Sequence, residues 1–140
     1  MKSLSESDAE QVKTILRVNT IKEIKEYASC IWDFTKYKYE QYVAVYTSEE
    51  KFWYGKILEI YAQQRMDIIF NVLIKISWFE EVTSTQVGPT RYFASGTIDF
   101  QNPQVLTGHI LVVKCDDDSG DVYIQQHFVK YYNRYIKNKK

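Results

Sequence analysis

The sequence lacks several features that identify common classes of protein. No apolar run approaches the roughly 20 residues that an α-helix needs to cross a bilayer, and the opening segment MKSLSESDAEQ contains no apolar core of a signal peptide. Only two cysteines are present, Cys30 and Cys115, and they lie too far apart for a zinc ribbon or a redox pair. We therefore expect a soluble intracellular protein whose two thiols are ordinary buried side chains.

Net charge and catalytic residue types are also scarce. Lys and Arg together number 18, as do Asp and Glu, so the whole chain offers no general attraction to nucleic acid or acidic lipid. The two histidines, His109 and His127, belong to no recognisable catalytic spacing, and the isolated glycines form no phosphate-binding motif. The segment CDDDSGD, residues 115–121, lacks the long loop of an EF-hand and favours a tight turn over a metal site. We expect no enzyme activity, no cofactor and no metal.

Aromatic residues, in contrast, are abundant. They make up 16% of the chain, and 12 of them are Tyr, which is common in strand-rich proteins. After a predicted helix over residues 5–17, the segments around 22–34, 35–47, 52–62, 68–79, 109–115 and 121–132 read as strands separated by short polar turns. Gly55 has no turn to form, which indicates a bulge or a close backbone approach. About six or seven strands after one helix predict a mainly β fold, a small distorted β-barrel.

The two ends of the chain offer possible contact surfaces. Val12, Ile15 and Leu16 form a narrow apolar stripe on the predicted helix, which either docks on the domain or serves a partner. This leaves open an adaptor role in a larger complex. At the other end, tyrosines alternate with basic residues that are candidates for a weak DNA contact: Lys130, Arg134, Lys137, Lys139 and Lys140.

Four segments, in order, resemble a bromo-adjacent homology (BAH) domain. They are YVAVYTSEEKFWYGKILEIY, VLIKISWF, RYFASGTIDFQNPQVLTGHILVV and DVYIQQHFVKYYN, and the resemblance spans about residues 27–133. In the third segment His109 stands where the family usually has Lys, and the residues that fit the family pattern are Phe93, Ser95, Asp99, Pro103, Leu106 and Gly108. Within this scaffold we expect Phe93 to lie in the core, and Ser95 and Asp99 to fix the backbone of a loop.

The resemblance implies a division of the chain and a function. Residues 1–21 would be an N-terminal helical extension, 22–133 a BAH-like β domain and 134–140 a basic tail. Similarity to this family implies a non-catalytic, nuclear, chromatin-associated module that contacts a histone tail, a nucleosome or another chromatin protein. The basic tail adds a possible weak DNA contact, and the lack of a long apolar run predicts no membrane contact. The alternative is an adaptor subunit of a larger nuclear complex.

Some BAH domains read methylated lysine with an aromatic cage, and the resemblance places three positions of that cage in this chain. Tyr54 and Trp78 match the family, whereas the third aromatic is replaced by Glu80. A carboxylate from Glu80 or Glu81 would favour a lysine that keeps an N–H over trimethyl-lysine. Trp53 or Phe52 could supply the missing wall.

The resemblance leaves a second interpretation open. Ile74, Ile76 and Trp78 alternate on one strand face, so Trp78 could be a core residue in a cage-less interaction module. We expect the contact surface to include Tyr54, Trp78, Glu80 and the loop that leads to Tyr92.

Overall fold

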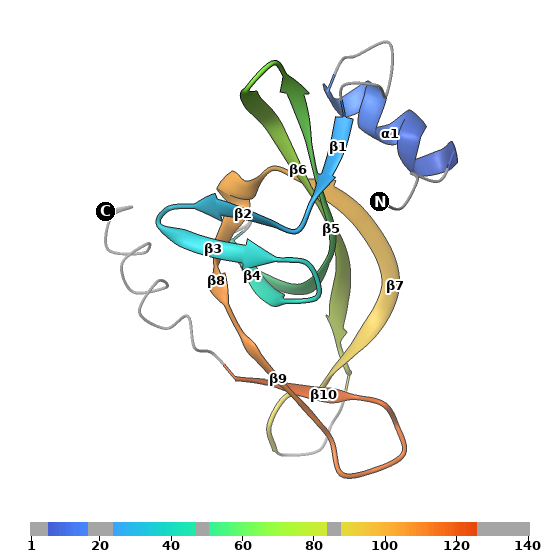
Figure 1. The fold of residues 1–140 in the computed structure, drawn as a ribbon. Coiled ribbons are helices and arrows are strands. Elements are labelled where there is room, and N and C mark those ends of the chain that lie inside the picture. The colour runs from blue at the N-terminus through green and yellow to red at the C-terminus, as the bar shows by residue number, and fades with distance from the viewer. Residues whose placement is uncertain (1–5, 17–23, 47–50, 84–87, 126–140) are drawn as a thin grey trace.

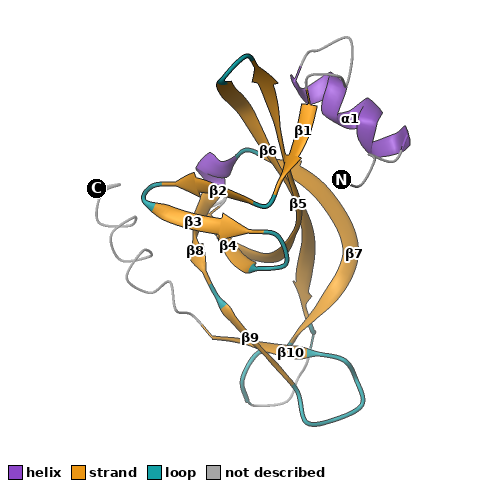
Figure 2. Cartoon of the chain, in the orientation of Figure 1, coloured by secondary structure: helices purple, strands orange, loops and turns teal. Residues whose placement is uncertain are grey.

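The computed structural model describes residues 6–16, 24–46, 51–83 and 88–125 (Figure 1). Within these residues, one helix is followed by ten strands, most of them short. Figure 2 shows the strands by colour. A 3-10 turn at Pro103–Val105 precedes the eighth strand. The elements are α1 Glu6–Leu16, β1 Ile24–Tyr27, β2 Ser29–Trp32, β3 Thr35–Lys38, β4 Tyr42–Tyr46, β5 Phe52–Arg65, β6 Ile68–Glu81, β7 Tyr92–Gln101, β8 Leu106–His109, β9 Leu111–Lys114 and β10 Val122–Gln125.

The strands form a small, distorted and nearly closed β-barrel, as the sequence predicts. The main sheet has the order β8-β4-β5-β6-β7-β10-β9, and β1 adds to β5. Its two end strands, β8 and β9, follow each other in the chain with only Ile110 between them, so the sheet curls back on itself (Figure 1). The long strands β5 and β6 carry register shifts, which bend the sheet and increase its twist. The β2–β3 hairpin forms a second small sheet.

Side chains fill the barrel on the face predicted from strand alternation. Ile57, Ile74 and Ile76 are completely buried at its centre, and the same cluster contains Trp78. A second cluster on the opposite face of β5 packs Tyr54 with aromatic and aliphatic residues of neighbouring strands. The β5 side chains therefore divide between two apolar layers, because successive residues of a strand point to opposite faces.

Helix α1 packs onto its own domain. Val12 is fully buried in a cluster with Tyr61, Leu73 and Phe100, and Asp8 forms an ion pair with Lys75 of β6. Ile15 is 47% exposed, and the side chain of Leu16 lies outside the described residues. The predicted apolar stripe thus serves in part to dock the helix. No helix in the described part of the chain has the length and hydropathy needed to span a membrane.

Two of the six predicted segments divide into two strands each, and β7 and β8 form in parts of the chain that the sequence does not predict as strands, so the count rises to ten. The segment expected over residues 22–34 bends at Ala28. There β1, which pairs with β5, ends and the β2–β3 hairpin begins. The segment over 35–47 breaks at residues 39–41, with Glu40 at φ 68°. Tyr37 and Tyr39 therefore do not share a face: Tyr37 is 1% exposed and Tyr39 is 51% exposed.

Other predictions about strands are also corrected. Gln63, Gln64 and Arg65 belong to β5, and the expected polar connection shrinks to a two-residue turn. Gln63 is buried, and its amide oxygen accepts a hydrogen bond from the Asn71 side chain at 2.6 Å, which offsets the cost of burying it. Phe93 is 37% exposed, because it lies opposite Glu80 at an end of the sheet that opens to solvent, so its prediction as core is wrong.

Candidate functional site

The candidate site begins where two neighbouring strands separate. Strands β5 and β6 remain paired as far as Gly55 and Trp78. Beyond that point, β5 continues beside β4 as far as the pair Phe52–Tyr46, and β6 continues beside β7 as far as the pair Glu81–Tyr92. The two strands thus form a fork, and side chains from both prongs face the space between them.

Gly55 marks the root of this fork. A Cβ atom at this position would overlap Cγ2 of Ile76 and would lie 3.0 Å from the carbonyl oxygen of Ser77 and 3.1 Å from Cε3 of Trp78. The missing side chain lets β6 approach β5 closely enough to seat the Trp78 indole beneath the fork. Of the two roles predicted for Gly55, a bulge or a close backbone approach, the structure shows the close approach.

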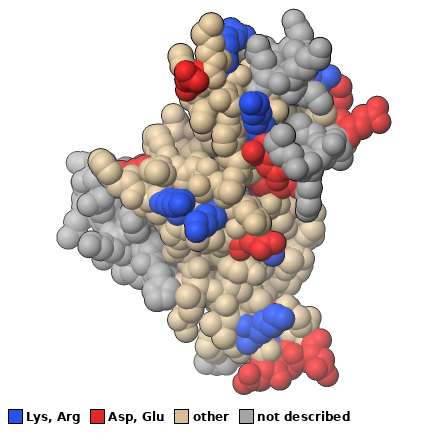
Figure 3. Space-filling view, viewed as in Figure 1, with Lys and Arg blue, Asp and Glu red and all other residues tan. Residues whose placement is uncertain are grey.

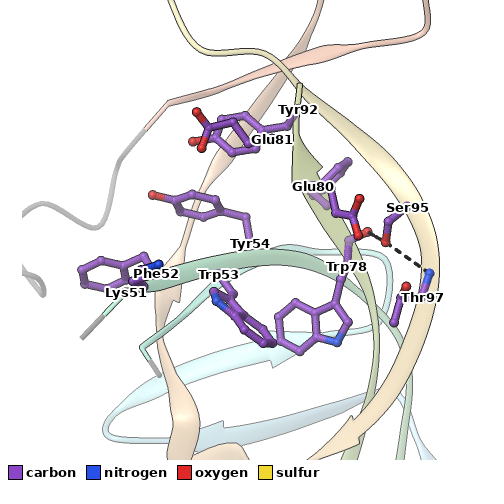
Figure 4. Close-up of a pocket in the computed structure, with 11 residues that line it drawn as sticks. Lys51, Phe52, Trp53, Tyr54, Trp78, Glu80, Glu81, Tyr92, Ser95 and Thr97 are labelled. Atoms are coloured by element: carbon purple, nitrogen blue, oxygen red, sulfur yellow. Dashed lines mark hydrogen bonds between the residues drawn. The ribbon is translucent and has the colours of Figure 1, made fainter. Parts of the chain in front are cut away.

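The fork encloses a pocket of about 400 Å³. Figure 4 shows Tyr54 projecting between the prongs, with the indoles of Trp53 and Trp78 meeting on one side and Tyr92 on the other. The lining residues are Lys51, Phe52, Trp53, Tyr54, Trp78, Phe79, Glu80, Glu81, Tyr92, Ser95 and Thr97. We call this the fork pocket.

Tyr54, Trp78 and Glu80, which the sequence predicts for the contact surface, line the fork pocket, and so does Trp53, the candidate for a further wall. Residues 84–87 of the predicted loop to Tyr92 lie outside the described residues. Tyr54 and Trp78 are 8% and 6% exposed, so each contributes only part of its ring to the pocket and the remainder to the core. Trp53 is 46% exposed and supplies a more open wall, and Glu80 is exposed at the rim. Trp78 therefore belongs to the core and also lines the pocket.

Tyr92 completes the aromatic lining from β7. Its ring meets that of Tyr54 edge to face, with 5.4 Å between centroids. Burial raises the pKa of the Tyr92 phenol, and the neighbouring Tyr54 and Glu81 raise it further. The phenol thus stays neutral at physiological pH and keeps a donor O–H at the pocket.

Ser95 and Thr97 of β7 form the far wall, and the sequence did not identify them as site residues. The Ser95 hydroxyl donates to the carbonyl oxygen of Trp78 at 3.1 Å and accepts from the backbone N–H of Thr97 at 3.2 Å (Figure 4). Ser95 fixes backbone as expected, but within a strand and not in a loop. The bulge between Ser77 and Phe79 sets this arrangement, and a single sequence carries no direct signal for it.

The remaining predicted sites lie elsewhere. Asp116, Asp117 and Asp118 form the β9–β10 turn as predicted, and acidic side chains gather there beside a basic one (Figure 3). His109 has a structural contact, since its Nε2 lies 2.9 Å from the carbonyl oxygen of Lys36. The candidates for DNA contact lie outside the described residues: Lys130, Arg134, Lys137, Lys139 and Lys140.

Comparison of the sequence with protein-family models and with curated proteins finds no match. The resemblance to BAH domains therefore stays a prediction.

Proposed function

We propose that this chain is a non-catalytic interaction module that binds a methylated lysine side chain of a histone tail in the fork pocket. One observation carries the proposal: Trp53, Tyr54 and Trp78 line a pocket of about 400 Å³ together with two carboxylates. Methylation removes N–H donors from the ammonium and adds apolar methyl groups, which weakens its hydration, while its positive charge is still attracted to aromatic faces. Each cation–π contact contributes roughly 0.5–2 kcal/mol.

The carboxylates specify which methylated lysine fits. Glu80 and Glu81 lie at the rim, and neither has an ion-pair partner among the described residues. Monomethyl- and dimethyl-lysine keep an N–H that a carboxylate accepts in a charge-assisted hydrogen bond. Trimethyl-lysine has no such donor, so we expect the pocket to prefer the lower methylation states.

The chemistry of the lining supports binding over catalysis. Among the described residues, no histidine or cysteine lines the pocket, and the Ser95 hydroxyl is engaged with the Trp78 carbonyl. A histone as the source of the lysine, and a nuclear location, follow from the resemblance to BAH domains.

The test is a titration of the full chain with histone-tail peptides that carry unmodified, mono-, di- or trimethyl-lysine, followed by NMR of the indole N–H groups. The chain contains three tryptophans. We expect the signals of Trp53 and Trp78 to move with dimethyl-lysine, while that of Trp32, on the separate β2–β3 hairpin, stays fixed. Unchanged Trp53 and Trp78 signals at millimolar peptide would overturn the proposal.

The adaptor alternative has weaker support. It relies on the apolar stripe of the N-terminal helix, yet Val12 is fully buried against the barrel. The exposed Ile15 is the part of that stripe, within the described residues, that remains accessible to a partner.

A further inference from the structure

The fork pocket is built from two similar halves on opposite faces of the sheet. Trp53 and Trp78 meet edge to face with centroids 5.5 Å apart and an interplanar angle of 84°. Tyr54 and Tyr92 meet in nearly the same way, at 5.4 Å and 81°. Because Trp53 and Tyr54 are consecutive in β5, their side chains point to opposite faces of the strand. The pocket therefore contains two separate aromatic pairs and not a single cage.

Each aromatic pair has its own carboxylate. Glu80 lies two residues after Trp78 in β6 and so shares its face, whereas Glu81 is paired with Tyr92 across the β6–β7 ladder. Figure 4 shows the same division, with Glu81 beside Tyr92 and Glu80 on the side of Ser95 and Trp78. We call Trp53, Trp78 and Glu80 the tryptophan half, and Tyr54, Tyr92 and Glu81 the tyrosine half.

The charge of the lining leaves both halves attractive to cations. The nearby Arg91 is held by Asp117 at 2.6 Å and by Asp121 at 3.8 Å, so it does not neutralise the pocket carboxylates. Lys51 is the one cationic side chain that lines the pocket in the described part of the chain. Among the described lining residues, two carboxylates against one ammonium give a net negative charge.

We propose that the ligand is an extended peptide with two adjacent basic residues, one side chain entering each half of the fork pocket. Successive side chains of an extended chain point to opposite sides, which matches two sites on opposite faces of the fork. The methyl-lysine of the proposed function, on which this inference rests, enters the tryptophan half, so its binding moves the Trp53 and Trp78 signals. The other basic residue is a lysine or arginine that binds the second aromatic pair and its carboxylate.

Calorimetry with a set of matched peptides tests the inference. One peptide carries dimethyl-lysine followed by arginine, and two others replace either basic residue with norleucine. We expect each replacement to weaken binding at least fivefold, because each removes a cation from one half. Equal affinity for the dibasic peptide and the peptide that keeps only dimethyl-lysine would overturn the inference while leaving the proposed function intact. Failure of every peptide to bind would overturn both.

Two carboxylate variants then assign the halves. Glu80→Gln and Glu81→Gln are each titrated with the three peptides, and Asp118→Asn in the β9–β10 turn serves as the charge-matched control. In one variant, replacing the first basic residue of the peptide with norleucine should no longer weaken binding. In the other variant, the same should hold for the second basic residue. The control should respond to both replacements as the unmodified chain does. If the affinity of both variants becomes independent of the same basic residue of the peptide, the pocket has a single cation site and the inference is wrong.

Discussion

Glu80 is the residue at which the fork pocket departs most from a three-walled aromatic cage. It lies at the rim beside Trp78, in the position where the BAH resemblance implies an aromatic residue. A carboxylate at this place offers a hydrogen-bond acceptor, whereas a ring would offer a further apolar face.

We therefore expect Glu80→Tyr to raise the affinity for trimethyl-lysine peptides about three- to tenfold, in line with one added cation–π contact, and to lower that for dimethyl-lysine peptides. Fluorescence or calorimetric titration measures both affinities. Asp118→Asn again controls for the change in net charge. Unaltered affinity for both peptides would place the lysine site away from Glu80.

Asp117 shows how a single side chain fixes a turn. Its carboxylate accepts hydrogen bonds from the hydroxyl and the backbone N–H of Ser119 and forms an ion pair with Arg91. Ser119 and then Arg91 lower the pKa of Asp117 to about 2 from its ordinary value of 3.8. Since the pKa is lower in the folded chain than in the unfolded one, ionised Asp117 stabilises the fold above about pH 4.

Asp117→Asn should therefore lower the melting temperature at neutral pH, and the difference from the unmodified chain should shrink as the pH falls from about 4 to about 2. Thermal unfolding followed by circular dichroism across this pH range measures it. Asp118→Asn should change little at any pH. A constant difference down to pH 2 would show that the ionised carboxylate is not the stabilising group.

For single residues, the sequence predicts the strand face on which a side chain lies better than its exposure to solvent. Strand alternation places Trp78 beside Ile76 correctly, because a period of two is a local property. The exposure of Phe93 and Tyr39 depends on where a strand ends and on which strand lies opposite. Both are set by distant parts of the chain, which a local pattern does not contain.

The separation of β5 from β6 depends on Gly55. A methyl group there would overlap Ile76 and press on the backbone of Ser77, so one strand would have to shift. Gly55→Ala should lower the free energy of unfolding by about 1–3 kcal/mol, the usual cost of overpacking, and should move the indole signals of Trp53 and Trp78.

Denaturant unfolding and NMR measure the two effects. Gly120→Ala is the contrasting variant: its new methyl group meets open space, and its φ of 80° makes it costly only through local strain. In the Gly120→Ala variant, the NMR signals of the tryptophan indoles should stay in place. If Gly55→Ala matches the unmodified chain in stability, the close approach of the strands does not form the fork.

Two positions of α1 test how the helix docks on the barrel. Val12 is fully buried and Ile15 is 47% exposed, so the two positions offer a matched pair. Val12→Ala should lower the free energy of unfolding by about 2 kcal/mol, because it leaves a cavity among Tyr61, Leu73 and Phe100. Ile15→Ala should cost much less. Similar losses at both positions would mean that the helix does not dock through Val12.

Over the whole molecule, the sequence predicts the architecture but not the path of the chain. Short apolar segments with polar turns after one helix indicate a small barrel, and the structure is one. The order of the strands, the addition of β1 to β5 and the separate β2–β3 sheet arise from pairings between distant segments. The fork pocket, in contrast, is bounded by strands consecutive in the chain, β4 with β5 and β6 with β7. Its members can be proposed from the sequence, but its two-faced geometry depends on where β5 and β6 separate, which strand alternation does not contain.

The fork has a consequence for the kinetics of binding. Each prong keeps its own neighbour, β4 for β5 and β7 for β6, so a ligand can enter without breaking a strand pair. Complexes with a preformed site usually associate in one step without a prior rearrangement. In stopped-flow tryptophan fluorescence, the observed rate should therefore rise linearly with peptide concentration. A plateau would mean instead that the fork opens before the peptide enters.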